Sequence, residues 1–378
     1  MRISKMEFYK IYSKKIIYFG LIGSILFLLF YFWMSVLGGE YMYIDGKCYT
    51  RTAAIRENIN TAREYAGPLT KEKVQEIVNR FGYTIEAEQL ETDPKTGNTK
   101  KGYYENSTNK FITENLTTKR FNREGELRLI SEQDSPIIAE LMDGTRIFGF
   151  TDGWGSDFRE MQMMVMVITS VLIVIASAPV FSEEYALHTA DILMITTYGK
   201  QKSAVSKILA ALCFSTLLYF TVTALLFSAF AATYGISGFS VSADLVFSDL
   251  AFSKINYGTV GSVLIQYVAA GLLGCWVTTC IPLYFSARHK QSFSTLIWGM
   301  MIYLLPIIIN TIILSPLRPT RFIMICRMII RWFPIYLPMN VLSGIMPIQH
   351  YLSYGCSLLL IVGASILAVR KYIRYQAG

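Results

Sequence analysis

This chain has little histidine, and it lacks paired cysteines and a nucleotide-binding loop. The sequence has three histidines and six cysteines in 378 residues, and no two cysteines form a Cys-x-x-Cys pair. This pattern excludes the common zinc-binding motifs. Only Cys48 lies in the largest polar block of the chain, so that block cannot form an internal disulfide. A G-x-x-x-x-G-K-[ST] loop is also missing, so the chain lacks the phosphate cradle of P-loop ATPases.

Charge is absent from six long apolar runs, each of which is long enough to cross a bilayer as a helix of about 18 or more residues. The first run has an apolar core of about 22 residues, longer than the apolar region of a signal peptide, and we interpret it as a retained anchor. The sequence therefore predicts an all-α polytopic membrane protein with six transmembrane helices. The six runs are Ile16–Leu37, Met163–Phe181, Ile208–Ala231, Ser262–Phe285, Phe293–Leu314 and Leu352–Val369.

The runs divide the chain into three parts, namely residues 1–38, 39–160 and 161–378. The middle part contains 17 Lys and Arg against 21 Asp and Glu, a net charge of −4 within a chain of +8. Its sequence predicts helices over Ala53–Tyr65 and Leu69–Phe81, with Thr70 near the start of the second. We expect residues 39–160 to form a mainly α or α+β domain between helices 1 and 2.

Basic residues predict the orientation of the chain in the membrane. Arg2 and four lysines precede the first run, and Lys and Arg recur in the loops after the second and fourth runs and after the sixth. By the positive-inside rule both termini are then cytoplasmic and residues 39–160 extracytoplasmic, in a plasma membrane that we take to be bacterial. The basic surplus is explained by the lipid bilayer, so we expect no nucleic-acid partner.

The segment 315–351 departs from this charge rule, because it should be outside and yet carries Arg321, Arg327 and Arg331. One interpretation is a re-entrant or interfacial helix whose arginines extend to lipid head groups as anchors. A second is an outer vestibule in which these arginines face anionic groups. A third, in which the segment crosses the membrane, is costly with three arginines.

The loop after the second run carries most of the functional information. We expect a cytoplasmic helix over 183–199, capped by Ser182, with Glu183 and Glu184 at its positive end. Ile192 and Leu193 make the helix partly amphipathic, and Lys200 begins a basic turn into the third run. A short helix joined to two spans could transmit motion from a soluble partner, but a plain solvated connector fits the pattern equally well.

At this loop the chain resembles the ABC-2 type transporter permeases. Phe181, Glu183 and Glu184, Thr189, Ile192-Leu193, Thr196-Thr197 and the basic run Lys200–Lys207 occupy the matching places. His188 stands where the family has Gly, and Tyr198 where it has Pro. Six spans and an outer re-entrant segment also fit, and the resemblance covers about 250 residues but not 39–160.

The resemblance implies a permease subunit of an ABC exporter that moves a peptide, drug or lipid-like substrate. It implies a separate cytoplasmic ATPase that binds the ATP, so the chain itself needs no cofactor and is not an enzyme. The ATPase would couple through Glu183, Glu184, Ile192, Leu193 and Lys200. A second permease copy or a paralogue would complete the path.

Two other classes fit less well. A membrane permease that senses a ligand or transmits force through residues 39–160 is one, although four spans suffice for the best-known architecture of that kind. The other is a CAAX-type intramembrane protease, which Glu183, Glu184, His188 and His289 loosely resemble. A catalytic site of that type must be shielded from bulk water, whereas these residues fall in predicted loops.

Overall fold

The computed structural model describes residues 2–84, 103–121, 127–195, 201–247, 250, 258–318, 320–341 and 347–374. The described part is mostly helical and has two small antiparallel sheets. It forms two compact units. Unit 1 consists of Met1–Leu28, Met161–Leu226 and Gln266–Gly378, and unit 2 of Leu29–Glu160 and Phe227–Ile265.

Six helical stretches of the described residues are long and apolar enough to cross a membrane. Each coincides with one of the six predicted runs, so the expectation of a mostly helical, multi-pass membrane protein is confirmed. The stretches are Lys15–Gly39, Ser156–Ala186, Gln201–Tyr234, Val260–Arg288, Ser292–Leu314 and Tyr351–Ile373.

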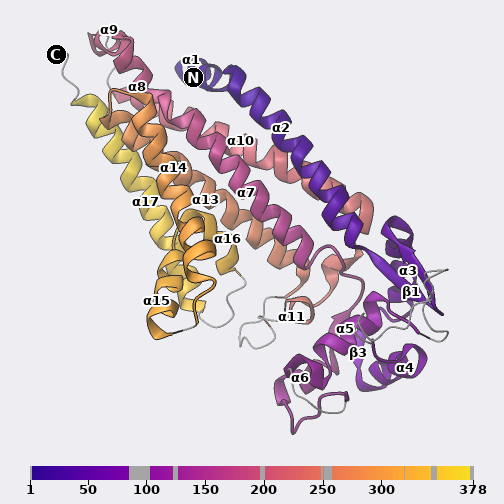
Figure 1. Ribbon diagram of the computed structural model, residues 1–378. Coiled ribbons are helices and arrows are strands. Elements are labelled where there is room, and N and C mark those ends of the chain that lie inside the picture. Colours follow the sequence, from indigo (N-terminus) through magenta and orange to yellow (C-terminus); the bar gives the residue numbers. More distant parts are fainter. Residues whose placement is uncertain are drawn as a thin grey trace. The chain divides into compact units, whose positions relative to one another are not determined.

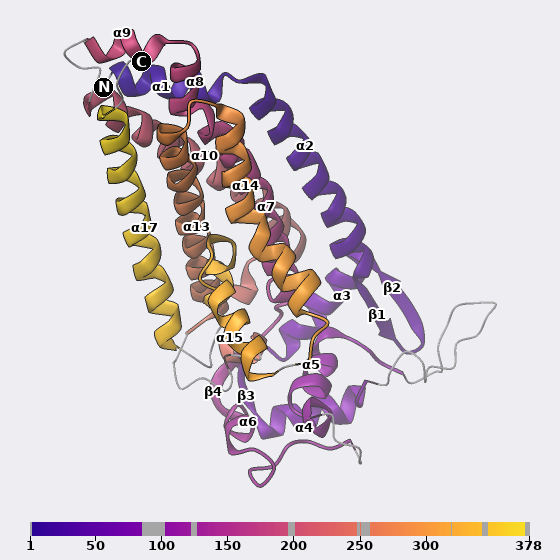
Figure 2. The same cartoon turned by 60° about the vertical axis from the view of Figure 1, so that its left-hand side comes forward.

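The helices of unit 1 form a bundle. The portions of the long helices that belong to this unit run side by side, and both chain termini lie at one end of the bundle with α1, α8 and α9 (Figures 1 and 2). The elements are α1 (Arg2–Tyr12), α2 (Lys15–Tyr31), α7 (Ser156–Ser177), α8 (Pro179–Ala186), α9 (Thr189–Ile195), α10 (Gln201–Tyr234), α13 (Val260–Arg288), α14 (Ser292–Ile308), η6 (Ile309–Leu314), α15 (Arg321–Ile330), η7 (Pro334–Tyr336), α16 (Leu337–Asn340) and α17 (Pro347–Ile373).

Glycines allow close packing in this bundle, as is common where membrane helices meet. A Cβ atom added at Gly20 of α2 would lie 2.5 Å from Leu172 Cδ2 of α7. One added at Gly299 of α14 would lie 2.7 Å from Val174 Cγ1 of the same helix α7. Larger side chains at these two positions would therefore separate α7 from its neighbours.

Pro179 marks the break between α7 and α8, since proline has no N–H for the helical ladder. Ser286 of α13 provides hydrogen bonds at the break. Its hydroxyl oxygen accepts from the backbone N–H groups of Phe181 and Ser182, both at 3.0 Å, and donates to the carbonyl of Ala178 at 2.7 Å. The junction between α7 and α8 is thereby held against α13.

The segment 315–351 forms two short helical pieces where the structure describes it. Arg321–Ile330 and Pro334–Asn340 are bent by 91° relative to each other across the intervening break. Thr320 caps the first piece, because its hydroxyl accepts from the N–H of Ile323 at 3.4 Å. The sharp bend agrees with a broken or re-entrant segment rather than a straight helix.

Unit 2 is an α+β assembly with two two-stranded antiparallel sheets, β1–β2 and β3–β4. Asp45 and Gly46 connect β1 to β2 with φ angles of 48° and 79°, as a tight hairpin requires. Its elements are η1 (Phe32–Val36), η2 (Leu37–Gly39), β1 (Tyr41–Ile44), β2 (Lys47–Thr50), α3 (Arg51–Glu64), β3 (Gly67–Thr70), α4 (Lys71–Phe81), α5 (Ser107–Asn115), η4 (Thr118–Phe121), α6 (Pro136–Glu140), β4 (Asp143–Phe148), η5 (Ser237–Ser240) and α11 (Ala243–Val246).

The core of unit 2 confirms the predicted helix ending at Phe81, although α4 begins at Lys71, after the short strand β3. Thr70 is its cap, accepting from Lys73 N–H at 3.3 Å, and Gly82 ends it with φ of 69°. The apolar face of α4 packs in a core that also contains Leu245. Residues 227–265, which the sequence analysis placed outside the domain, thus contribute to this unit.

Candidate functional site: an ionic cluster joining four helices

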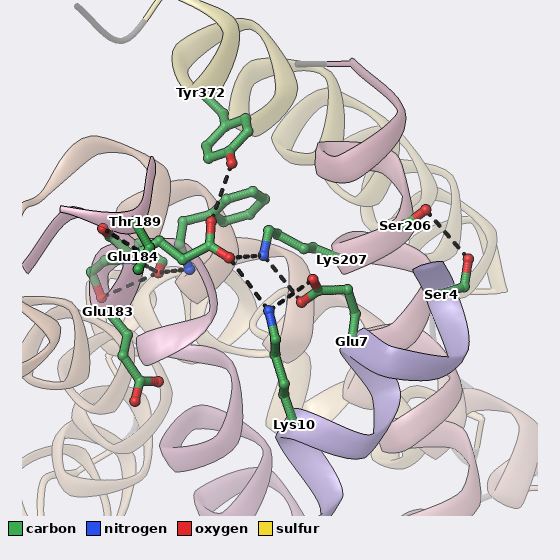
Figure 3. A network of polar contacts seen from close by, with 12 residues as sticks. Ser4, Glu7, Lys10, Glu183, Glu184, Thr189, Ser206, Lys207 and Tyr372 are labelled. Atoms are coloured by element: carbon green, nitrogen blue, oxygen red, sulfur yellow. Dashed lines mark hydrogen bonds and ion pairs between the residues drawn. The ribbon is translucent and has the colours of Figure 1, made fainter. Parts of the chain in front are cut away.

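Four charged residues and a tyrosine of unit 1 meet at the end of the bundle that holds both termini (Figure 3). We call Glu7, Lys10, Glu184, Lys207 and Tyr372 the ionic cluster. Lys207 Nζ of α10 donates to Glu7 Oε2 of α1 at 3.0 Å and to Glu184 Oε1 of α8. Lys10 Nζ pairs with Glu7 at 3.0 Å and Glu184 at 3.7 Å. Tyr372 OH of α17 donates to Glu184 Oε2 at 3.1 Å.

The ionic cluster is electrically balanced and mostly buried, although the Lys10 side chain is 57% exposed. The Lys207 side chain is 1% exposed, and those of Glu7 and Glu184 are each 11% exposed. Two carboxylates face two ammonium groups, so each buried charge has a compensating partner. Burial opposes the charge of Lys10, but its hydrogen bond and ion pairs with Glu7 and then Glu184 outweigh that effect and raise its pKa.

Aromatic packing fixes the tyrosine of the cluster. The ring of Tyr372 lies 5.0 Å from that of Phe181 and 6.1 Å from that of Tyr185, measured between centroids. Tyr185 OH in turn donates to the carbonyl of Ala287 at 3.2 Å. The ionic cluster is therefore continuous with contacts from α8 to both α13 and α17.

A pocket of about 650 Å³ opens beside the cluster, between α1 and the α8–α9 segment. Lys14 and Glu183 line it and form an ion pair of 2.7 Å between Nζ and Oε2. Half of the Glu183 side chain is exposed, and it points away from the Glu184 carboxylate in Figure 3. Ile192 and Leu193 of α9 also line the pocket.

The ionic cluster links α8 to three other helices, and its carboxylates are held by lysines and a tyrosine. His289, which the protease comparison needs, stacks on Phe285 with 6.3 Å between ring centroids. What the cluster can do is transmit a displacement of α8 to α1, α10 and α17.

The predicted single helix over 183–199 is wrong in its boundaries. Ser182 lies inside α8, where its hydroxyl donates to the Ala178 carbonyl at 2.9 Å, so it is not a cap. The helix then breaks at His188, whose φ is 55°, and α9 starts at Thr189. Because Pro179 had already started a helix, Ser182 had no free helix end to cap. Residues 196–199 lie outside the described residues.

The predicted coupling residues differ in their burial and in their contacts. Glu184 belongs to the ionic cluster, whereas Glu183 is at the surface beside Lys14. Ile192 is 70% exposed and Leu193 is intermediate. Lys200 lies outside the described residues.

The three arginines of the segment 315–351 named above also differ from one another. Arg321 is exposed, and Arg331 is an exposed residue at the end of α15 whose carbonyl accepts from Asn340 Nδ2 at 2.9 Å. Arg327 is half-buried, and its Nη2 donates to the carbonyl of Leu314 at 2.8 Å. This bond satisfies the carboxyl end of η6, a role that neither the anchor nor the vestibule interpretation included.

Sequence reasoning missed Glu7, Lys207 and Tyr372. A signal was present, because only six acidic residues lie outside 39–160, and Glu7, Glu183 and Glu184 are three of them. An acid in a basic N-terminal segment, and a lysine at the edge of an apolar run, each need a partner. Their pairing across 200 positions of the chain could not be read from spacing.

The comparisons with known proteins identify nothing similar. The chain matches no protein-family model, no curated protein and no solved structure at a significant level.

Proposed function

We propose that this chain is the permease subunit of an ATP-binding cassette exporter. It works in a bacterial plasma membrane with both termini in the cytoplasm, and a separate ATPase subunit supplies the energy. A second copy or a paralogue completes the path for a peptide, drug or lipid-like substrate. In this proposal the α8–α9 segment is the docking element for the ATPase.

The observation that carries the proposal is the attachment of α8 to the rest of unit 1. A docking element can drive a permease only if it is rigidly joined to several spans, and the ionic cluster joins α8 to α1, α10 and α17. Leu187, Ile192 and Ile195 remain 66%, 70% and 88% exposed. Exposed apolar side chains next to a rigid linkage are what a partner surface requires.

The backbone conformation of His188 gives a physical explanation for one part of the resemblance to the ABC-2 permeases. The family has Gly at this place, and here the residue adopts φ of 55°, which glycine adopts without steric cost. A sharp break between two short helices at this point is therefore consistent with the family pattern, even though the residue itself differs.

The test is co-purification of this chain with an ABC ATPase subunit from the solubilised membranes of its own cell. Changing Ile192 and Ile195 to Glu should abolish capture of the ATPase, because two charges would have to be buried in the interface. The matched control is Ile137→Glu in unit 2, where the isoleucine is 46% exposed. Glu183→Lys should weaken capture without unfolding the protein, since half of that side chain is exposed.

Two results would contradict the proposal. One is undiminished ATPase capture and ATP-dependent export by the Ile192→Glu, Ile195→Glu variant at normal membrane levels. The other is the absence of any ATPase that associates with the wild-type protein when membranes are solubilised and the chain is purified.

A further inference from the structure

Unit 2 contains a small pocket that the proposed function does not use. Its volume is about 50 Å³, several times the roughly 10–15 Å³ that one water molecule needs. Apolar side chains make much of the wall, including Phe111, Phe148 and Phe150. The polar side chains of the wall come from Ser107, Thr108, Thr151 and Asp152.

Thr108 is the first sign that this pocket takes a ligand. The residue is 1% exposed, and its Oγ1 has no hydrogen-bond partner among the described residues. Leaving a buried hydroxyl without a partner costs about 1–3 kcal/mol, so native structures rarely do so without a reason. A bound group that donates a hydrogen bond would remove that cost.

A shortage of positive charge around Asp152 is the second sign. Its carboxylate experiences the negative charges of Glu40 and Asp157 and the positive charge of Lys110. Lys110 is shared, because it also interacts with Glu105 and Glu114 and lies 5.3 Å from the ring centroid of Tyr41. Tyr234 OH donates to Glu40 Oε1 at 2.7 Å but adds no charge. Burial, followed by the Glu40 charge, raises the pKa of Asp152 to about 7.

We infer that this pocket binds the primary ammonium group of an organic ligand. The ammonium N–H groups would donate to the Asp152 carboxylate and to Thr108 Oγ1, supplying both the missing charge and the missing hydrogen-bond donor. The phenylalanine rings of the wall suit the alkyl chain that such a ligand carries beside its ammonium group. A metal ion fits less well, because the described residues contain no group of three His, Cys, Asp or Glu side chains able to hold one.

Two kinds of ligand carry a primary ammonium group on an alkyl chain, namely a free alkylamine and a peptide with a lysine side chain. The pocket belongs to unit 2 alone, so the inference stands whether or not an ATPase docks on α9. It assigns unit 2 a binding role that the resemblance to transporter permeases does not cover.

The experiment measures thermal unfolding of the full chain in detergent at pH 8, with n-butylammonium chloride as the probe. We expect a saturable rise in Tm, as for any ligand that binds only the folded state. Tetramethylammonium chloride at the same concentration has the charge but no N–H donor and should give little shift. A blocked Gly-Lys-Gly peptide in a parallel series distinguishes the sources, since a stronger response to it indicates a peptide ligand.

Variants of the pocket complete the test. Asp152→Asn should raise the n-butylammonium concentration needed for the response at least tenfold. Thr108→Val should also weaken the response, and it serves as the test variant if Asp152→Asn fails to fold. Asp45→Asn is the matched control, because Asp45 lies in the exposed β1–β2 turn. The inference is overturned if wild type shows no saturable shift with either probe, or if the pocket variants respond as wild type does.

Discussion

At the scale of single residues, Lys207 has the largest structural consequence. Of the two lysines in the ionic cluster, Lys207 is the one whose ammonium group lies within hydrogen-bond distance of both the Glu7 and the Glu184 carboxylate. Its side chain is almost completely buried. A buried ion pair adds little stability compared with apolar packing, but removing one partner is costly because the other charge remains buried. The main effect of removing Lys207 would therefore be to leave the carboxylates of Glu7 and Glu184 buried with less positive charge beside them.

We predict that Lys207→Met destabilises the protein by roughly 3–5 kcal/mol, because Glu7 and Glu184 then share only Lys10. Thermal unfolding of the purified protein in detergent measures the change. Lys5→Met, at an exposed position of the same α1 helix, is the control. Adding Glu184→Gln to Lys207→Met should restore part of the loss, and purely additive losses would show that the two residues are not coupled.

Asp152 gives a pH-dependent prediction. The ordinary aspartate pKa is about 3.9, and in the folded protein it is raised to about 7. The folded state therefore keeps a proton that the unfolded chain loses, so stability falls as pH rises from about 4 to about 7.

The neutral variant Asp152→Asn should then be more stable than wild type at pH 8 without added amine, and this advantage should disappear toward pH 4. Melting temperatures measured across this range check the sign, with Asp45→Asn as the control for an aspartate-to-asparagine change at an exposed position. An Asp152→Asn variant that melts below wild type at pH 8 would show that the carboxylate is needed in its charged form.

At the scale of elements, the sequence predicted long helices well and short ones poorly. The six spans follow from uncharged runs, and nothing else satisfies backbone groups over such lengths in a bilayer. Thr70 and Gly82 marked the ends of α4 because capping is local. The α8–α9 break was missed because it depends on His188, a left-handed residue that is not glycine.

The candidate site, too, was predicted only in part from the sequence. Glu184 was identified from the sequence, but as a surface residue for a partner, whereas the structure buries it against Lys207. The partners of a charge are set by how helices pack, and one sequence does not reveal that. Arg327 illustrates the same limit, because its bond to Leu314 requires α15 to lie beside η6.

The break at His188 is testable with two substitutions that both lack the imidazole. A β-branched residue is strongly disfavoured at positive φ, whereas glycine is not. We predict that His188→Gly is more stable than His188→Val by roughly 1–2 kcal/mol in thermal unfolding. Equal stability of the two variants would mean that the residue does not hold φ near the 55° of this structure.

The arginines of α15 give a second prediction for this scale. Arg327→Gln should cost about 1–3 kcal/mol, because the buried end of η6 loses the donor to the Leu314 carbonyl. Arg321→Gln, at an exposed position of the same helix, should leave stability close to wild type. Transport measured per inserted molecule should be unchanged in both, and a drop in that ratio for Arg327→Gln would favour the vestibule interpretation instead.

At the scale of the whole molecule, charge separates the chain into two chemically different parts. Residues 39–160 are acidic overall, with 17 basic and 21 acidic residues, while the chain as a whole carries +8. Apart from the arginines of segment 315–351, most of the excess basic residues lie next to the ends of apolar runs, and by the positive-inside rule we expect those ends to be cytoplasmic. The proposed ATPase docking at α9 requires this orientation, so topology tests the proposal independently of any transport assay.

Two cysteine positions decide the orientation. Cys48 is exposed in the β2 strand of unit 2, and an impermeant thiol reagent should label it on intact cells. Cys48→Ala together with Cys326→Ala should remove that label. Cys326 is partly exposed in the segment predicted to be outside, whereas Cys213, although exposed in the isolated chain, lies within a predicted span that a charged reagent does not enter. In this double-variant background, Lys5→Cys should react only after the membrane is permeabilised. If instead Lys5→Cys reacts on intact cells and Cys48 does not, α9 faces away from cytoplasmic ATP, and an ABC ATPase cannot be its partner.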